Sequence, residues 1–335
     1  MAKKRVLQIV RRLDVPRGAE RLVADLVRTQ DNHDVLVFDG SGSFYDLGTG
    51  QLIQVQGFAQ ALWYCLRNRH QYDLFHLHMV PACYLAFFLR QRAILHVHSA
   101  HYPRRKRHLV RLLDWGLHRI ARSTITVSAE ASDGMRAFIG DVPRMYTLPN
   151  FVPEVAPVTK PITTETGITR ILMVASLDRP KRQDILIKAL EYLPQYFVVT
   201  LAGVGAHEQS LRDLAKNLGL ADRVVFLGAV KDIASAYASA DICALISDWE
   251  GFGLVVLEAA QLGKVTVVTD VPGLRESCPD PRLIVQDPTP EAVAKKIVET
   301  VELKDDAALS DVLKSHAAKH SIGNYVTQLD KLYDL

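Results

Sequence analysis

Two runs of alternating strand and helix patterns, separated by a proline-rich stretch, constrain the fold of this chain most strongly. The first run contains short apolar segments such as "RVLQIV" and "RAILHVHSA", and the helical period of "AERLVADLVRTQ" follows the earliest of them. The same alternation resumes at "RILMVASL" and continues to "GKVTVVTD". Strands that alternate with helices predict parallel sheets covered on both faces. The chain is therefore predicted to be α/β, with two Rossmann-like domains.

The boundary between the two domains is predicted from the break in this alternation. Four prolines interrupt the periodicity there: Pro149, Pro153, Pro157 and Pro161. Such a stretch is typical of a linker. The predicted divisions are a first domain, a linker, a second domain and a last helix that packs back on the first domain: 1–150, 151–165, 166–319 and about 320–335. Ligands of open α/β sheets bind beyond the carboxyl ends of the strands, so a site is expected in a cleft between the domains.

Composition favours a globular protein of the cytoplasm. The chain is 48% hydrophobic and 23% charged, which is ordinary for a soluble domain. Its longest uncharged apolar run, "VPACYLAFFL", is half of what a bilayer crossing needs. The four cysteines are far apart and form no CxxC motif, which favours reduced thiols over a disulfide framework or a zinc site.

The charge is distributed unevenly between the two halves. Residues 1–150 carry 21 Lys/Arg and 12 Asp/Glu, hence 21 − 12 = +9, and residues 151–335 carry 19 − 25 = −6. The densest basic cluster is Arg104, Arg105, Lys106 and Arg107. A peripheral contact with an anionic membrane surface, at its inner face, is one interpretation. A solvated helix face is the other, and no nucleic-acid-binding module is recognisable.

The segment "DWEGFGLVVLEAAQLG" predicts a ligand site. It places Glu250 in the loop after the strand "DICALIS" and Glu258 about one turn into the following helix. The free N–H groups of a helix N-terminus bind phosphate or sugar hydroxyls, and a carboxylate accepts hydrogen bonds from paired hydroxyls. The structural alternative is that Glu250 merely complements the helix dipole and that Glu258 reaches solvent.

Several segments in register resemble the retaining GT-B glycosyltransferases, most closely glycosyltransferase family 4. "EGFGLVVLE" resembles the E-x7-E signature of that family, and "RGAERLVADLV" resembles its N-terminal glycine loop. "LMVASLDRPKRQDILIKAL", "LAGVGAHEQSLRDLAKNLGLADRVVFLGAV" and "VTDVPGLRES" resemble its C-terminal domain in order. The resemblance implies the GT-B fold, in which two Rossmann-like domains face each other across a cleft.

The resemblance also implies roles for particular residues. Glu258 is expected to hold the ribose of a nucleotide-sugar donor, and Glu250 to act beside the donor sugar. Lys181 is expected to neutralise the diphosphate, with Arg179 in place of a family arginine that is missing at Ser176. The remaining expected donor-binding positions act through backbone groups: Gly18, Phe252, Gly253, Leu254 and Val230.

Histidines flank two predicted strands of the first domain. His98 ends its strand where the family often has a histidine that faces the donor sugar, so it is a candidate catalytic residue. His76 and His96 are expected to be core histidines, because no carboxylate or cysteine cluster accompanies them as in a metal site. Glu20 is expected on an exposed helix surface.

The function implied is transfer of a sugar, with retention, from a nucleotide-sugar donor to a glycan or lipid-linked acceptor, as in the synthesis of envelope polysaccharides or glycolipids. No Asp-x-Asp pair occurs in the sequence, so no metal and no cofactor beyond the co-substrate are expected. A sugar-nucleotide epimerase of the same fold, a glycogen-type phosphorylase and a non-catalytic nucleotide-sugar-binding module remain alternatives, although no lysine can be assigned to the pyridoxal group that a phosphorylase needs. A nicotinamide dehydrogenase is disfavoured, because "GVG" at 203–205 lacks the third glycine of that fingerprint.

Overall fold

The computed structural model describes residues 3–15, 18–98, 108–155 and 167–335. The chain divides into two compact units. The first comprises Met1–Phe151 together with Ile322–Leu335, and the second comprises Val152–Ser321. The last helix therefore belongs to the first unit.

The first unit is built on a parallel sheet. In the described residues its strand order is β3-β2-β1-β4-β5-β6-β7. The strands are β1 Val6–Val10, β2 His33–Val37, β3 Leu52–Gln54, β4 Leu74–His78, β5 Ala93–Val97, β6 Ser123–Thr126 and β7 Met145–Thr147. The helices are α1 Gly18–Thr29, α2 Gly57–Arg67, α3 Ala86–Leu89, α4 His108–Ile120, α5 Ala129–Ile139 and α13 Ile322–Asp334. Strand order reverses between β1 and β4, as in a Rossmann fold.

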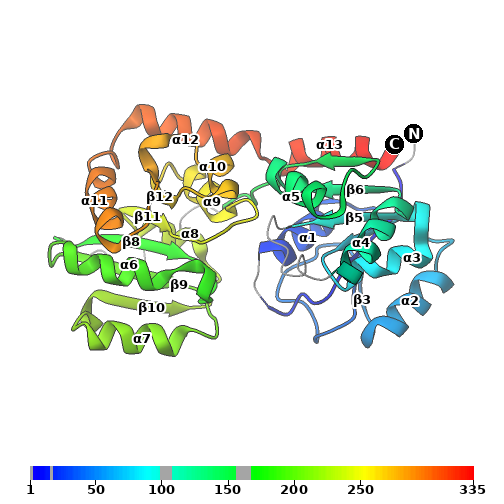
Figure 1. The fold of residues 1–335 in the computed structure, drawn as a ribbon, viewed down its shortest axis with the longest axis horizontal. Coiled ribbons are helices and arrows are strands. Elements are labelled where there is room, and N and C mark those ends of the chain that lie inside the picture. The colour runs from blue at the N-terminus through cyan, green and yellow to red at the C-terminus, as the bar shows by residue number, and fades with distance from the viewer. Residues whose placement is uncertain (1–2, 16–17, 99–107, 156–166) are drawn as a thin grey trace. The chain divides into compact units, whose positions relative to one another are not determined.

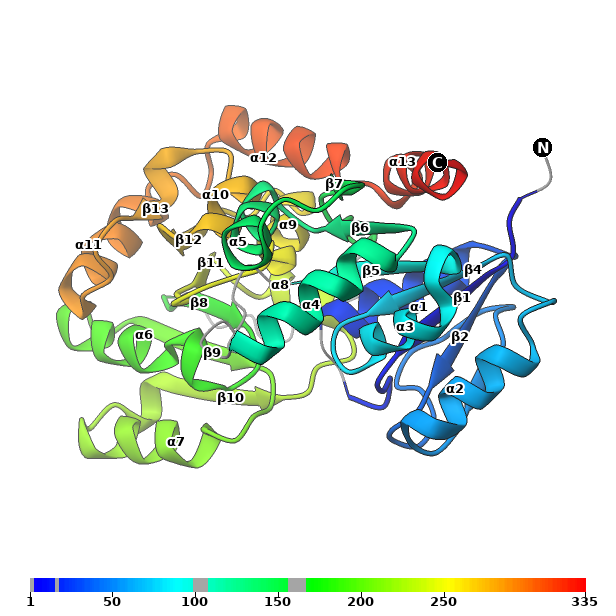
Figure 2. The same cartoon turned by 45° about the vertical axis from the view of Figure 1, so that its right-hand side comes forward.

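The two faces of this sheet differ in polarity because side chains alternate along each strand. Leu7, Phe75 and Leu77 point to one face and pack with α2, α3 and α4, which lie on the same side of the sheet in Figures 1 and 2. The intervening residues point the other way. There, Gln8 and His76 contact Tyr333 of α13, so a polar core lies beneath the C-terminal helix.

The second unit repeats the topology. Its sheet, in the part of the chain that the structure describes, has the order β10-β9-β8-β11-β12-β13, and all its pairs are parallel. The strands are β8 Thr169–Val174, β9 Phe197–Ala202, β10 Val224–Gly228, β11 Ile242–Leu245, β12 Thr266–Thr269 and β13 Ile284–Val285. The helices are α6 Gln183–Ala189, α7 Glu208–Asn217, α8 Ile233–Ala238, α9 Leu254–Gln261, α10 Pro272–Ser277, α11 Pro290–Val301 and α12 Ala307–Lys319.

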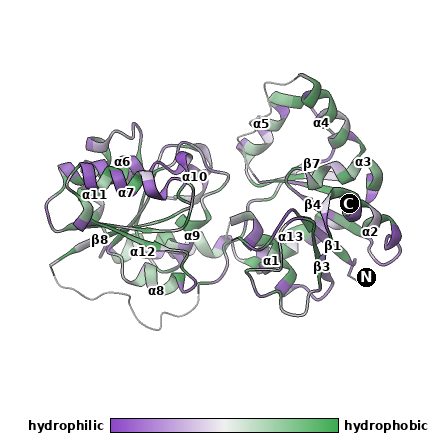
Figure 3. Cartoon of the chain, turned by 90° about the horizontal axis from the view of Figure 1, so that it is seen from below, coloured by the Kyte–Doolittle hydropathy of each residue, from purple (hydrophilic) through white to green (hydrophobic). Residues whose placement is uncertain are grey.

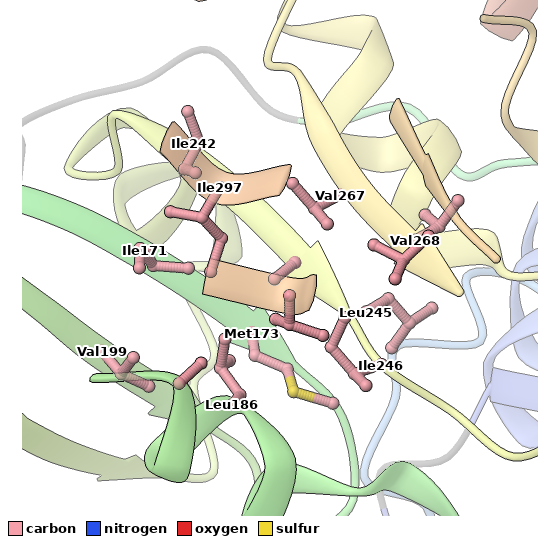
Figure 4. Packing of buried hydrophobic residues seen from close by; sticks show 14 of the residues in the cluster. Ile171, Met173, Leu186, Val199, Ile242, Leu245, Ile246, Val267, Val268 and Ile297 are labelled. Atoms are coloured by element: carbon pink, nitrogen blue, oxygen red, sulfur yellow. The ribbon is translucent and has the colours of Figure 1, made fainter. Parts of the chain in front are cut away.

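The core of the second unit is mainly aliphatic. Ile171, Val199, Ile242 and Val267 of the central strands pack against Leu186 of α6 in one cluster (Figure 4). Hydrophobic colour follows the strands of this sheet in Figure 3. Strands buried on both faces are expected to be continuously apolar, and this is why "RILMVA" and "VTVV" carry so little alternation.

None of the helices in the described ranges combines the length and the hydrophobicity that a membrane crossing requires. The four cysteines are buried and free. Burial raises the pKa of the Cys278 thiol to about 11 and that of Cys65 to about 12, so these thiols stay protonated at neutral pH.

The buried histidines of the first unit make its stability depend on pH. Burial lowers the pKa of His33, His98 and His118 to about 4. Burial also lowers the pKa values of three further imidazoles well below the usual value: His76, His78 and His96. A depressed histidine pKa means that the folded state excludes a proton that the unfolded chain binds below about pH 6.5. The stabilisation is therefore complete above that pH and is lost as the pH falls toward 4.

We predict that lowering the pH from 7.0 to 5.5 reduces the unfolding free energy of the first unit. Each buried histidine contributes a slope of about 1.4 kcal/mol per pH unit below its unfolded pKa. Urea unfolding in a Trp249→Phe background, where Trp63 and Trp115 of the first unit report by fluorescence, measures the effect. His118→Gln removes one titrating group. The unfolding free energy of this variant is expected to fall less steeply with decreasing pH, by the contribution of one proton. Equal stability at the two pH values would contradict the prediction.

Candidate functional site

The candidate site of the second unit lies where its strand order reverses. Strands β8 and β11 are neighbours and parallel, yet their helical connections leave toward opposite edges of the sheet. The loops after them, 175–182 and 246–253, therefore lie together at the carboxyl edge. This is the position at which open α/β sheets bind their ligands.

A charged pair joins the two loops. The Lys181 ammonium, at the end of a short 3-10 turn Arg179–Lys181, pairs with the Glu250 carboxylate. Ser247 Oγ donates a hydrogen bond of 3.0 Å to Glu250 Oε1. Both charged side chains are mostly buried, with 22% of the Lys181 side chain and 13% of the Glu250 side chain exposed. Partial burial strengthens the attraction above that of a surface pair, so the pair holds both loops.

A second set of contacts fixes the backbone of the same loops. The Asp248 N–H donates to the Pro180 carbonyl at 2.8 Å. The Arg182 guanidinium contacts Asp248 at 2.9 Å and Asp184 at 3.1 Å, and its side-chain hydrogen bonds to Asp184 and Asp248 raise its pKa. Gln183 Nε2 donates to the Ser176 carbonyl at 2.9 Å. The loop that carries Lys181 is thus anchored at both ends.

Two glycines allow neighbouring segments to pack closely against the loops after β8 and β11. Gly203 has φ +149° and lies so near the Ala175 carbonyl that a side chain there would overlap it. A Cβ on Gly273 of α10 would lie 2.7 Å from the Glu250 carbonyl oxygen. The "GVG" and "VPGL" segments therefore serve close packing against the loops after β8 and β11, which is a reason for glycine independent of any dinucleotide motif.

Glu258 is buried, in contrast to the structural alternative in which it reaches solvent. It lies in the second turn of α9 and is 3% exposed. The Tyr237 hydroxyl of α8 donates to Glu258 Oε2 at 2.9 Å and lies 3.1 Å from the Val255 carbonyl. A buried carboxylate is costly unless it is hydrogen-bonded, and Tyr237 supplies that bond. Tyr237 was not predicted from the sequence, because its apolar helical spacing looks like ordinary core.

The predicted backbone positions fall around the start of α9. Gly253 is the N-cap of this helix with φ +71°, and Leu254 is its first residue. Phe252 is buried at 2% exposure and contacts His320 with ring centroids 5.2 Å apart. The Phe252 side chain therefore anchors the loop, whereas its backbone lies at the helix terminus. Val230 is half-buried in the loop between β10 and α8.

Three cations occupy the loop after β8, and their partners differ. Lys181 pairs with Glu250, and Arg182 pairs with two aspartates. Arg179 is exposed, and it makes no ion pair with any residue that the structure describes. Among the described residues of this loop, Arg179 is therefore the cation left available for an incoming anion.

In the first unit, the predicted residues are placed partly as expected. Gly18 is the first residue of α1 and not a loop residue. Glu20, predicted on an exposed helix surface, is instead 5% exposed in the first turn of α1, on the buried side of that helix with Val23, Ala24 and Val27. His98 directly follows β5 at the carboxyl edge of the sheet. Arg104, Arg105, Lys106 and Arg107 lie outside the described residues.

The histidines of the first unit form a cluster that the sequence did not reveal. His76 Nε2 lies 3.1 Å from His96 Nδ1, and His78 Nδ1 lies 2.9 Å from His98 Nε2. The ligand nitrogens of His76, His78 and His96 lie within 4.8 Å of one another, so among the described residues these three could hold a metal ion. Hydrogen bonds to each other, to Gln8 and to Tyr333 already engage both nitrogens of His76 and His78.

Helix α4, which follows the basic cluster in the sequence, presents an exposed apolar face. Leu109 is 83% exposed and Leu112 is 67% exposed, and Leu113 and Trp115 are also exposed. The Arg119 guanidinium lies over the Trp115 ring at 4.9 Å from its centroid. Spacing of three and four residues places Leu109, Leu112 and Leu113 on one side of the helix.

Comparison with known proteins agrees with this architecture. The protein HepE of Anabaena, solved in complex with UDP-glucose, superposes with a TM-score of 0.84 at 21% identity, over 98% of this chain and 99% of that one. WaaG, described as a glycosyltransferase involved in lipopolysaccharide biosynthesis, superposes with a TM-score of 0.71 at 17% identity, over 98% of this chain and 99% of that one.

The fold is that of the GT-B glycosyltransferases. The expected α/β architecture of two Rossmann-like domains is confirmed.

Residues 160–320 of this GT-B chain match the family described as "Glycosyl transferases group 1". A D-inositol 3-phosphate glycosyltransferase of Mycobacteroides abscessus is 36% identical over 159 residues, which are 45% of this chain and 36% of that protein. The matches span between about a third and a half of the first curated relatives. The segment that matches the family model contains both glutamates and Lys181, and it lies in the second unit.

Proposed function

We propose that this protein is a retaining glycosyltransferase that moves a sugar from a nucleotide-sugar donor to a glycan or lipid-linked acceptor. The observation that carries the proposal is the arrangement at the start of α9. There a buried carboxylate, Glu258, and a Lys181–Glu250 pair surround the N-terminus of a helix at the strand-order reversal. The family match over 160–320 supports sugar transfer rather than epimerisation or simple binding.

The proposed division of roles follows from the surroundings of each group. Glu258 accepts the ribose hydroxyls, because its carboxylate is held rigidly by Tyr237. Lys181 and Arg179 neutralise the diphosphate, and the backbone N–H groups of Phe252, Gly253 and Leu254 add the positive end of the helix dipole. Gly18 of the first unit contributes backbone contact to the phosphates, and Val230 offers backbone groups to the base.

The chemistry proposed is stabilisation of a leaving group. Cleavage of the bond to the anomeric carbon leaves negative charge on the diphosphate, and fixed cations and N–H groups lower the barrier if they are already oriented. Glu250 lies beside the sugar and His98 contributes from the first unit as a second catalytic group. The sequence has no Asp-x-Asp pair, so the cations of the loop after β8 are proposed to act in place of a metal.

The donor and the acceptor are proposed by chemistry and by likeness. HepE was solved with UDP-glucose, so a uridine nucleotide sugar is the first donor to test. Envelope polysaccharide or glycolipid precursors are the proposed acceptors, in line with the described role of WaaG. The cytoplasm, at the inner face of a membrane, is the proposed place of reaction.

We predict that Lys181→Ala weakens binding of UDP and UDP-glucose at least tenfold, which corresponds to about 1.4 kcal/mol. The cause is loss of a charge that neutralises the diphosphate. Isothermal calorimetry measures the affinities, after a thermal-shift screen of nucleotide sugars has identified the donor that stabilises the protein most. Lys188→Ala is the matched control, because Lys188 is a lysine of α6 that pairs with Asp184 and makes no ion pair with Glu250. Equal affinity in wild type and Lys181→Ala would refute the role.

We predict separable effects for the two glutamates. Glu258→Gln is expected to weaken UDP and UDP-sugar binding alike, by about 1.5–3 kcal/mol, since a charged acceptor for the ribose is lost. Glu250→Gln is expected to leave UDP affinity unchanged or tighter, because it releases Lys181, and yet to lower kcat strongly. Glu291→Gln, at the exposed first turn of α11, serves as control. Equal loss of UDP affinity in both variants would show that the division of roles is wrong.

We predict salt-sensitive binding of the protein to vesicles that contain anionic lipid. The basic cluster supplies about 1 kcal/mol per residue near the surface, and the exposed leucines of α4 insert at the interface. Replacing Arg104, Arg105, Lys106 and Arg107 by serine should reduce sedimentation with vesicles, as should the double variant Leu109→Ser, Leu112→Ser. Trp63→Ser, which alters an exposed residue of α2, should sediment like wild type. Absence of wild-type sedimentation would leave the cluster as a solvated face.

A further inference from the structure

The polar core of the first unit consists of two hydrogen-bonded rows that run across the sheet. One row links Tyr333, His76 and His96, with separations of 2.8 Å and 3.1 Å. The other links Gln8, His78 and His98, with separations of 2.7 Å and 2.9 Å. The rings of His76 and His78 lie 4.4 Å apart between centroids, and those of His96 and His98 lie 4.2 Å apart. The second row leads to the carboxyl edge of the sheet and ends at His98.

The second row determines which nitrogen of each ring carries a proton. Gln8 Nε2 donates toward Tyr333 Oη and His33 Nδ1, both at 3.2 Å. That orientation turns Gln8 Oε1 toward His78 Nε2, and a carbonyl oxygen only accepts. His78 therefore carries its proton on Nε2. In a neutral imidazole the other nitrogen, Nδ1, must then accept.

The same logic extends by one step to His98. Because His78 Nδ1 accepts, His98 Nε2 must donate to it across the 2.9 Å contact. His98 Nδ1 is then a bare acceptor. It is buried, and no described residue donates to it. An unsatisfied buried acceptor is unfavourable until a donor reaches it, and a hydroxyl is the donor that a sugar provides.

We propose that Gln8 and His78 are positioning residues that hold His98 as the neutral, Nε2-protonated tautomer, so that His98 Nδ1 accepts a hydrogen bond from a hydroxyl of the sugar substrate. The proposal deepens the role given to His98 and, in its last step, rests on the proposed function. The tautomer itself is a property of the free protein. The ring orientation is set at the same time, because His78 is held on both of its nitrogens.

Burial supports the neutral form of these rings. Loss of solvation lowers the pKa of His98 to about 4 and that of His78 well below its usual value. Around them lie further neutral groups: His76, His96, Gln8 and Tyr333. A metal bound at His78 Nδ1 would displace the contact with His98, so the two arrangements exclude each other and can be distinguished.

The first experiment reads the tautomers directly. Nitrogen-15 NMR of the histidine-labelled, ligand-free full chain at pH 7.5 separates protonated from bare ring nitrogens, with signals assigned by His78→Asn and His98→Asn. The expected spectrum has His78 and His98 both neutral and protonated on Nε2. A His98 ring protonated on Nδ1, or on both nitrogens, would overturn the proposal. So would stoichiometric zinc in the purified protein, if it contacts His78.

The second experiment replaces two residues of the row Gln8–His78–His98, one at a time. Gln8→Leu and His78→Leu should each convert the His98 signals to a mixture of tautomers, because the acceptor that selects Nε2–H is lost. His76→Leu is the matched control. It is an equally buried histidine of β4, two residues away, and it bonds to Tyr333 and His96 but not to His98. An unchanged His98 tautomer in both Gln8→Leu and His78→Leu would overturn the positioning role.

The third experiment connects the tautomer to turnover. For the nucleotide sugar selected by thermal shift, or UDP-glucose, His78→Leu should lower kcat at least tenfold and leave UDP affinity unchanged, with partial recovery in His78→Asn, whose amide oxygen replaces Nδ1 as an acceptor. Full activity in His78→Leu would overturn the proposal. If wild type has the expected tautomer but processes no nucleotide sugar, the proposed function fails while the positioning by Gln8 and His78 stands.

Discussion

The reversal of strand order between β8 and β11 is the constraint on which the candidate site depends. It sends the two helical connections apart and leaves two loops with unpaired backbone at one edge of the sheet. The two loops bond to each other: the Asp248 N–H donates to the Pro180 carbonyl, and the Arg182 guanidinium pairs with the Asp248 carboxylate. The Lys181–Glu250 pair closes the same junction. Charges and hydrogen bonds between the loops thus hold both of them at this edge of the sheet.

The two units share one topology and differ in what their central strands bury. In the second unit both faces of β8 and β11 are apolar. In the first unit one face of β1, β4 and β5 carries Gln8 and the histidine rows. A purely structural core would place Val or Leu there, because buried polar groups add stability only when fully bonded. These buried polar side chains lie on strands next to the reversal of strand order, where His98 reaches the edge of the sheet. Their location favours a functional reason for keeping polar residues there.

The sequence predicted the architecture well and the fine structure of the site poorly. Alternation and the prolines near Pro149 were sufficient for two α/β domains, because burial patterns are periodic and local. The sequence also placed Glu250 in the loop before a helix and Glu258 about one turn into it, because the apolar strand "DICALIS" ends shortly before Glu250. The Tyr237–Glu258 bond and the burial of Glu20 were not predictable, since each depends on how a helix packs on the rest of its unit. The Lys181–Glu250 pair was not predictable either, since it joins two loops that are far apart in the sequence. The histidine rows join β1, β4, β5 and α13, which are distant in the sequence, and no local pattern signals them.

Acidic side chains offset most of the positive charge in the loop after β8. Glu250 offsets Lys181, and Asp184 and Asp248 offset Arg182, so Arg179 is the cation of this loop with no ion pair among the described residues. Under the proposed function, a diphosphate that reaches Lys181 competes with Glu250, whose carboxylate then loses its partner. With Glu250 in its proposed place beside the anomeric centre, the released carboxylate would be stabilised by the positive charge that develops on the sugar as the bond to the leaving group stretches. The proposed roles would thus couple diphosphate binding to the availability of Glu250, and the energy of that exchange would be recovered mainly in the transition state.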